Sequence, residues 1–147
     1  MKLVKVKIGD FEIANQVGEY KNFTGRIDWL SAKARVENAH FELLRNGDIR
    51  WRNGTWKSGT WKNGSWERGI WLEGIWLEGI WKSGNWFGGT WKNGTWKNGQ
   101  FNGGSWLNGT WYNGTWYNYP EEWRNGIWHK GIINGKPSKV SPAKFNG

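Results

Sequence analysis

Residues 89–98 read GTWKNGTWKN, two copies of one five-residue unit. From Gly54 onward, a glycine stands two positions before each aromatic residue of a strict series. A period of five matches neither the 3.6-residue period of a helix nor the two-residue period of a strand. A glycine in every unit would also cost a helix about 1 kcal/mol each relative to alanine. The stretch therefore predicts a chain that turns a corner after every unit, with a core ladder of Trp51, Trp56, Trp61, Trp66, Trp71, Trp76, Trp81, Trp86, Trp91, Trp96, Phe101, Trp106, Trp111 and Trp116.

The phase of the repeat extends in both directions. Upstream, Val36 and Phe41 are in phase with Trp51, and each has an alanine two positions earlier. The in-phase unit between them contains Asn46-Gly47, which predicts a turn or a local break. Downstream, residues 119–122 shift the phase by two. The five-residue spacing then resumes at Trp123, Trp128 and Ile133.

Corners after every unit indicate an all-β solenoid. Four sides of five residues would make a square coil of about twenty residues, and coils stack at about 4.8 Å. The repeats would then form about five square coils, in which Trp51 and Trp71 belong to one of four stacked ladders. Glycine, the smallest residue, would make room for each indole, since interiors tolerate neither voids nor overpacking. Burying one indole contributes at most about 5 kcal/mol, against about 7 kcal/mol of ordering entropy per unit, so stability must come from stacking many units.

An antiparallel β-meander of Asn-Gly hairpins is the alternative architecture. Asn-Gly between Thr-Trp-Lys segments is a strong hairpin signal. However, the residue before glycine is Arg68, Glu73 or Glu78 in three units. A type I′ hairpin needs positive φ at that residue, which these side chains tolerate poorly. A type II corner needs positive φ only at the glycine, so corners are favoured over reversals.

Two kinds of unit resemble known repeat proteins. Residues 34–36 and 39–41 resemble units of the pentapeptide-repeat superfamily, whose members form a right-handed quadrilateral β-helix. The Gly-Thr-Trp-Lys-Asn units are similar to Trp/Gly arrays in small proteins of large tailed bacteriophages. The resemblance covers residues 34–133 and implies a right-handed β-solenoid. It also implies a phage accessory protein that acts inside the host cell or on the virion.

The chain divides into three parts. Residues 1–33 predict an N-terminal β cap, because Val4, Val6 and Ile8 alternate with lysines as in a strand with one wet face. We expect Trp29, which is off the repeat phase, to pack against the first turn. Residues 34–119 form the Trp/Gly solenoid. Residues 120–147 hold the last repeats after a short insertion and then a flexible or surface-draped tail.

The sequence offers no catalytic chemistry. It has no cysteine and two histidines, His40 and His129, neither within a metal-binding or triad pattern. The adjacent pair Glu121-Glu122 lacks the spacing of a glycosidase. We therefore expect no enzyme, cofactor or metal. The longest apolar runs cannot span a membrane, and the N-terminus lacks a signal-peptide core, so we expect the cytoplasm of the host or the virion.

The surface suggests binding. Six apolar residues at outward positions predict a contact surface; they are Ile70, Leu72, Ile75, Leu77, Ile80 and Phe87. The net charge is +9, spread along the chain. Candidate polyanion contacts are Arg52, Lys57, Lys62, Lys82, Lys92 and Lys97.

These surfaces favour a non-catalytic structural or protein-interaction module that binds a protein partner or self-associates. A basic polyanion or nucleic-acid binder, weak and non-specific, is one alternative. An inhibitor of a host protein is another. A glycan binder would need outward tryptophans, or the exposed rings of Tyr112, Tyr117 and Phe87. No membrane partner is expected.

Overall fold

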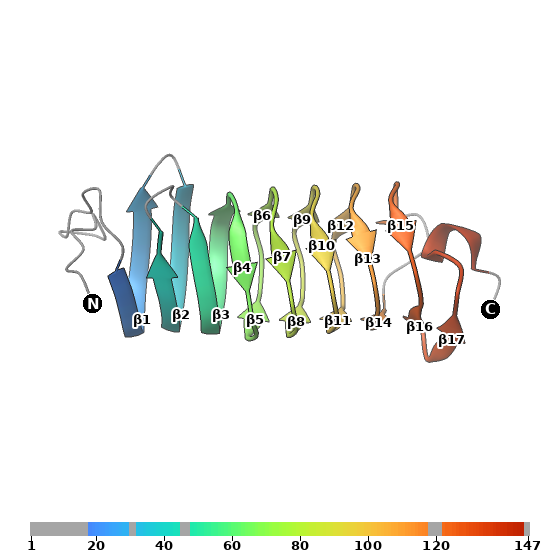
Figure 1. The fold of residues 1–147 in the computed structure, drawn as a ribbon, viewed down its shortest axis with the longest axis horizontal. Coiled ribbons are helices and arrows are strands. Elements are labelled where there is room, and N and C mark those ends of the chain that lie inside the picture. Colours follow the sequence, from blue (N-terminus) through green and yellow to red (C-terminus); the bar gives the residue numbers. More distant parts are fainter. Residues whose placement is uncertain (1–17, 30–31, 45–47, 118–121, 146–147) are drawn as a thin grey trace.

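A computed structural model of the 147-residue chain describes residues 18–29, 32–44, 48–117 and 122–145. The described chain is all-β, and its coils stack in one row between β1 (Gly18–Trp29) at one end and β17 (Lys136–Ser138) at the other (Figure 1). The repeats form a β-solenoid of about five turns, as the sequence predicts. Neighbouring repeat strands run parallel, which rules out the antiparallel meander.

The strands of the repeat are short because each side of a coil is only five residues long. β3 (Ile49–Trp61) runs around the first coil. The strands that follow are β4 (Gly64–Trp66), β5 (Ile70–Trp71), β6 (Ile75–Trp76), β7 (Ile80–Trp81), β8 (Asn85–Trp86), β9 (Thr90–Trp91), β10 (Thr95–Trp96), β11 (Gln100–Phe101), β12 (Ser105–Trp106), β13 (Thr110–Trp111), β14 (Thr115–Trp116) and β15 (Ile127–Trp128).

Each coil has three sides, not the four that we expected. Trp51 pairs with Trp66, and Trp56 with Trp71, so one coil takes fifteen residues. Trp51 and Trp71 therefore lie on different sides. The tryptophans form three ladders, and the three sides are named after them. Side 1 carries Trp51, Trp66, Trp81, Trp96, Trp111 and Trp128; side 2 carries Trp56, Trp71, Trp86, Phe101, Trp116 and Ile133; side 3 carries Trp61, Trp76, Trp91, Trp106 and Trp123.

Packing explains the triangle. Because glycine has no side chain, each unit places only one large group inside the coil. For equal side lengths, the cross-section of a square coil has roughly 1.7 times the area per inward residue that a triangular coil has. One indole per side would leave a void in the square coil, and protein interiors do not tolerate such voids. In the triangle, indoles of one coil meet edge to face, as Trp51 and Trp56 do at 5.9 Å and 70°. Indoles of successive coils stack face to face, as Trp51 and Trp66 do at 4.8 Å and 4°.

An antiparallel cap covers the N-terminal end. β1 (Gly18–Trp29) pairs with β2 (Ala32–Leu43), and β2 pairs antiparallel with β3. Val36 and Phe41 therefore belong to a reversed strand and not to an ordinary parallel coil. They are still buried on the ladders: the ring of Phe41 stacks on Trp51 at 5.9 Å. The expected strand at Val4, Val6 and Ile8, the break at Asn46-Gly47 and the side chain of Trp29 lie outside the described residues.

The two-residue phase shift after Trp116 is absorbed before Trp123. Trp106 stacks on Trp123 and Trp111 on Trp128, although each pair is seventeen residues apart. The ladders therefore continue in phase, as the resumed spacing predicts. Residues 118–121, which lie between the two parts, are outside the described structure.

The C-terminal segment closes the last coil. β16 (Gly131–Ile133) and β17 (Lys136–Ser138) form a hairpin across Asn134-Gly135, both with positive φ. A short 3₁₀ helix, η2 (Pro142–Lys144), follows. The Trp128 indole donates to the Ser138 carbonyl at 3.2 Å, and Phe145 packs against the core. Here the structure differs from the flexible or draped tail that the prolines, serines and lysines suggested, because the hairpin covers ladder ends that would otherwise be bare.

Candidate interaction surfaces

The inside of the solenoid is closed. Every repeat tryptophan from Trp51 to Trp116 and Phe101 is fully buried, so a glycan cannot reach the repeat indoles. Among the described residues, no three His, Cys, Asp or Glu side chains gather as a metal site would require. The residues before and after each tryptophan point outward and differ from coil to coil. The chemistry that distinguishes one part of the rod from another therefore lies on its three sides.

The expected contact residues do not form a single patch. Ile70, Ile75 and Ile80 occupy one coil, one residue on each side, and each is 38 % exposed. They form a ring around the rod, and a flat partner can therefore reach only one of them at a time. Leu77 lies half-buried on side 3.

The two remaining residues of the expected contact surface, Leu72 and Phe87, both lie on side 2. Leu72 and Phe87 follow Trp71 and Trp86 in successive coils, and the Phe87 N–H donates to the Trp71 carbonyl at 2.8 Å. Leu72 is 42 % exposed and Phe87 is 49 % exposed. We call Ile70, Leu72 and Phe87 the apolar patch. Tyr117 is exposed on the same side two coils further on, and Asn102 lies between it and Phe87.

The expected cationic residues also divide among the sides. Arg52 forms an ion pair with Glu42, and Lys57 pairs with Glu37 at 2.9 Å. Lys57 is therefore balanced by one carboxylate, whereas Glu42 also pairs with Arg50 at 3.1 Å, so that cluster keeps a net charge of +1. The other four lie in two pairs that follow tryptophans of one ladder each: Lys62 and Lys92 on side 3, and Lys82 and Lys97 on side 1.

Charge is unequal among the sides beyond the first coil. Side 1 carries four Lys/Arg (Arg68, Lys82, Lys97 and Lys130) and one acid, Glu67, a net charge of +3. On the repeat strands of side 2 Glu73 is the single charged residue described, a net charge of −1, and Lys136 lies on β17, which pairs with β16 at the end of this side. Among the described residues, side 3 carries two cations and two acids, Glu78 and Glu122, a net charge of zero.

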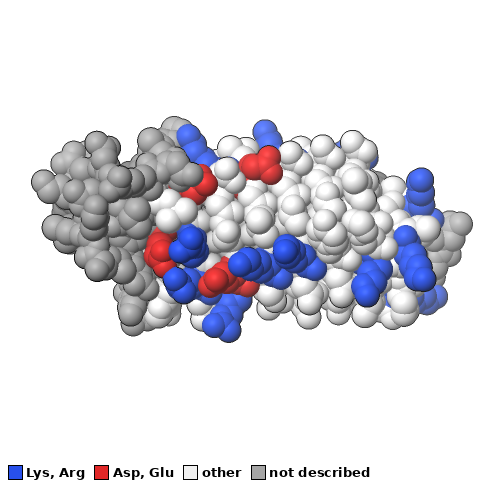
Figure 2. Space-filling view, viewed as in Figure 1, with Lys and Arg blue, Asp and Glu red and all other residues white. Residues whose placement is uncertain are grey.

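The acids of side 3 are held by neighbouring coils: Glu78 accepts from Asn93, and Glu122 accepts from the Ser105 hydroxyl at 3.0 Å. In the view of Figure 2, the visible acidic atoms lie among Lys and Arg atoms in the half nearer the N-terminal end, whereas toward the C-terminal end the visible charged atoms belong to Lys and Arg. The excess of positive charge is therefore concentrated on one side and toward one end, and not spread evenly over the surface.

The length of a coil decides which outward residues are neighbours. The coil of about twenty residues expected from the sequence would place Lys92 beside Tyr112. The fifteen-residue coil instead places Tyr112 above Lys97, and the two-residue shift then brings His129 above Tyr112. The two rings stack at 4.6 Å with 4° between their planes. The phase shift was visible in the sequence. Which residues it brings together could be worked out only once the number of sides in a coil was known.

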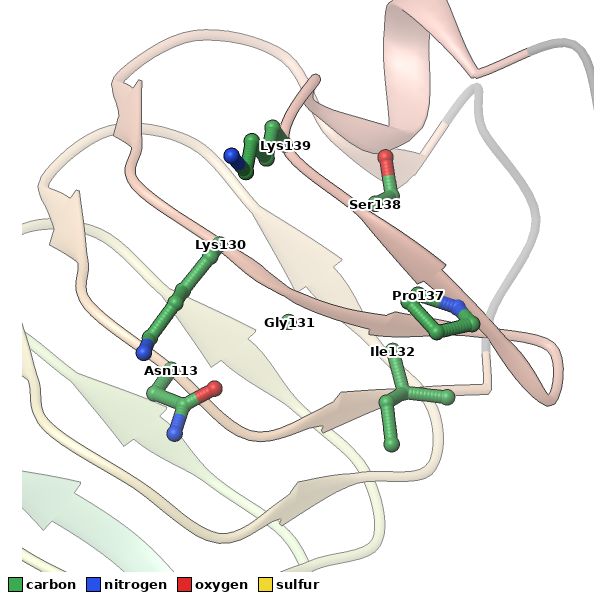
Figure 3. Close-up of a pocket in the computed structure, with 7 residues that line it drawn as sticks. All are labelled: Asn113, Lys130, Gly131, Ile132, Pro137, Ser138 and Lys139. Atoms are coloured by element: carbon green, nitrogen blue, oxygen red, sulfur yellow. The ribbon is translucent and has the colours of Figure 1, made fainter.

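Two open hollows flank the C-terminal hairpin. One, of about 480 Å³, lies beside β16 and β17 and is lined by Asn113, Lys130, Gly131, Ile132, Pro137, Ser138 and Lys139 (Figure 3). In the figure the Lys130 side chain extends toward Asn113, while Lys139 comes from the segment after β17. The second hollow, of about 390 Å³, lies between Trp123, Trp128 and η2. Residues 123–145 carry five Lys/Arg and no Asp/Glu, so this end of the rod is basic.

The fold and these surfaces define a β-solenoid repeat protein whose sides differ in chemistry. Comparisons with protein-family models, with curated proteins and with solved structures found no match. Within the described residues, no helix has the length and apolarity needed to cross a membrane.

Proposed function

We propose that the chain is a non-catalytic interaction module that associates with a second copy of itself through the apolar patch on side 2. The observation that carries the proposal is the pair Leu72 and Phe87, two large apolar side chains in adjacent coils that stay about half exposed. Exposed apolar patches on otherwise polar proteins mark contact surfaces. The stacked indoles behind the patch make a rigid backing for it.

Charge selects the side through which two copies can meet. The chain carries +9 overall, so two copies repel each other most where their basic sides meet. Side 2, with a net charge of −1 beyond the first coil, allows the closest approach. A two-fold dimer uses the same patch on both copies, and an apolar strip packs against itself without burying a charge.

Sedimentation or light scattering over a range of concentrations tests this association. We expect a concentration-dependent dimer that Leu72→Asp abolishes, because two buried carboxylates would face each other. Leu107→Asp is the matched control, since Leu107 also follows a ladder tryptophan but lies on side 3. A chain that stays monomeric at all concentrations would contradict the proposal, as would equal association of both variants.

We further infer an accessory role in a tailed phage, inside the host cell or on the virion. The support is the similarity of the Gly-Thr-Trp-Lys-Asn units to Trp/Gly arrays of phage proteins. Mass spectrometry of purified virions and of infected cells tests this role. Finding the chain in neither would contradict it.

A further inference from the structure

One outward column on side 1 differs from all others in composition. Beyond Arg52 in the first coil, its members follow the ladder tryptophans of successive coils; they are Glu67, Lys82, Lys97, Tyr112 and His129. Backbone hydrogen bonds fix neighbours in the column: the Lys97 N–H donates to the Trp81 carbonyl at 2.8 Å. Parallel strands in register place such neighbours about 4.8 Å apart. Two lysines and two rings therefore form one row about 14 Å long.

Lys82 and Lys97 are adjacent and exposed, and no ion pair joins either to a carboxylate within the described chain. Like charges directly opposite on neighbouring strands are destabilising. In contrast, the half-buried Leu77 separates Lys62 from Lys92 on side 3. An anion bound along side 1 would offset the repulsion between Lys82 and Lys97.

The next two members of the column supply a flat aromatic surface. Tyr112 is 46 % exposed and stacks on the exposed imidazole of His129. Stacking already orders both side chains, so a third ring that packs on them costs little additional side-chain entropy. Lys130, which follows His129 and extends toward Asn113 (Figure 3), adds a cation at this end of side 1.

We propose that side 1 binds single-stranded nucleic acid. Lys82 and Lys97 contact successive phosphates, and Tyr112 with His129 receives an unstacked base. Sequence-independent single-strand binding uses this combination of a cationic track and aromatic platforms. A duplex keeps its bases stacked inside, so it would use the lysines and leave the rings without a role. The proposed dimer uses side 2, and the two proposals therefore stand or fall separately.

Fluorescence anisotropy of a labelled oligothymidylate at low salt tests the cationic track. We expect the double variant Lys82→Ala/Lys97→Ala to weaken binding roughly tenfold. The slope of log affinity against log salt should also become shallower by about 1.4, at about 0.7 per lost phosphate contact on a single strand. The matched control is Lys62→Ala/Lys92→Ala, which removes the same charge from side 3. Equal weakening by both double variants would overturn the proposal, because it would indicate general charge attraction.

The rings are tested by a pair of tyrosine variants. Tyr112→Ala should weaken binding of the single strand about fivefold or more, the effect expected when a stacked base loses its platform. Tyr117→Ala, at the equivalent position on side 2, should not change it. Binding of a duplex should be insensitive to both changes. No binding at low salt, or a Tyr112→Ala variant that binds the single strand as wild type does while its thermal unfolding is unchanged, would overturn the proposal.

Discussion

At the scale of single residues, glycine and tryptophan serve different needs. The corner glycines from Gly54 to Gly126 have φ between +97° and +134°, a region that other residues rarely adopt. They also lie against the neighbouring coil: a Cβ on Gly94 would lie 2.4 Å from the carbonyl oxygen of Gly79. That carbonyl accepts the Thr95 N–H at 2.9 Å. Glycine is therefore required by backbone conformation and coil spacing, beyond the room that it leaves for an indole.

The adjacent glycines Gly88 and Gly89 allow a test of why glycine is needed at the corner, because only Gly89 combines a positive φ with a close approach to the neighbouring coil. Gly89→Ala should destabilise the fold by about 3 kcal/mol or more, because its φ is +99° and the new Cβ would lie 2.1 Å from the Gly74 carbonyl oxygen. Gly88→Ala should change stability by about 1 kcal/mol or less, since its φ is outside the left-handed region and the nearest atom beyond its neighbours is the Leu72 carbonyl oxygen at 3.3 Å. Chemical denaturation followed by circular dichroism measures both. Equal losses would contradict this account of the corner.

Burial of the indole N–H groups opposes folding wherever the N–H has no hydrogen-bond acceptor. Trp71 donates to the Gly88 carbonyl at 3.1 Å, and Trp111 to the Lys130 carbonyl at 3.2 Å. Ten other buried indoles have no hydrogen-bond partner, and an unpaired buried donor costs about 1–3 kcal/mol. Stacking and burial must outweigh this cost at every step. The fold therefore depends on the rings more than on their polar atoms.

At the scale of elements, the caps matter because the strands are too short to stand alone. A two-residue strand is stable only when a coil pairs on each of its edges. β2 covers the first coil and the β16–β17 hairpin covers the last. Each cap reverses the chain direction and thereby ends the parallel stacking.

Removing the C-terminal cap tests its role. A chain that stops after Ile133 should melt at a lower temperature, and acrylamide should quench more of its tryptophan fluorescence. The physical reason is that Trp128, only 9 % exposed, would lose its hydrogen bond to Ser138 and the cover of η2. Val140→Ala, at an exposed position in the same segment, serves as the control and should leave both measurements unchanged. Unchanged melting and quenching in the shortened chain would contradict a capping role.

At the scale of the whole molecule, the solenoid is a sum of nearly equivalent coils. Each coil contacts only its neighbours, so stability depends on how many interfaces are stacked. The same register that stacks the indoles aligns outward residues into columns. A change in the number of residues per coil would therefore rearrange every surface while leaving the inward pattern intact.

Deleting residues 67–81, one coil, tests this organisation. The join of Trp66 to Lys82 keeps the five-residue phase and keeps Lys82, Lys97 and Tyr112 in one column. We expect a folded chain with lower thermal stability, shorter by about 4.8 Å in small-angle scattering. It should lose dimerisation with Ile70 and Leu72 and retain oligonucleotide binding. A chain that fails to fold would contradict the equivalence of coils.

Much of this architecture was predictable from local pattern. The five-residue period, the glycine before each aromatic residue and the shift after Trp116 predicted a β-solenoid of about five turns with buried indoles. These features depend on the chain within one unit, where φ preference and side-chain size act directly. The cap's reversed direction was not predictable, because Val36 and Phe41 show the same inward spacing whichever way the strand runs.

Local sequence pattern is enough to establish which residues face inward and where the chain turns. The closure of a coil by three units is a property of the folded molecule, because it depends on how large rings fill a cross-section together. That single choice placed Tyr112 on His129, Lys82 beside Lys97 and Leu72 beside Phe87. A residue is buried because of its own side-chain chemistry. Its neighbours on the surface depend on the number of residues in one coil, which many side chains set together.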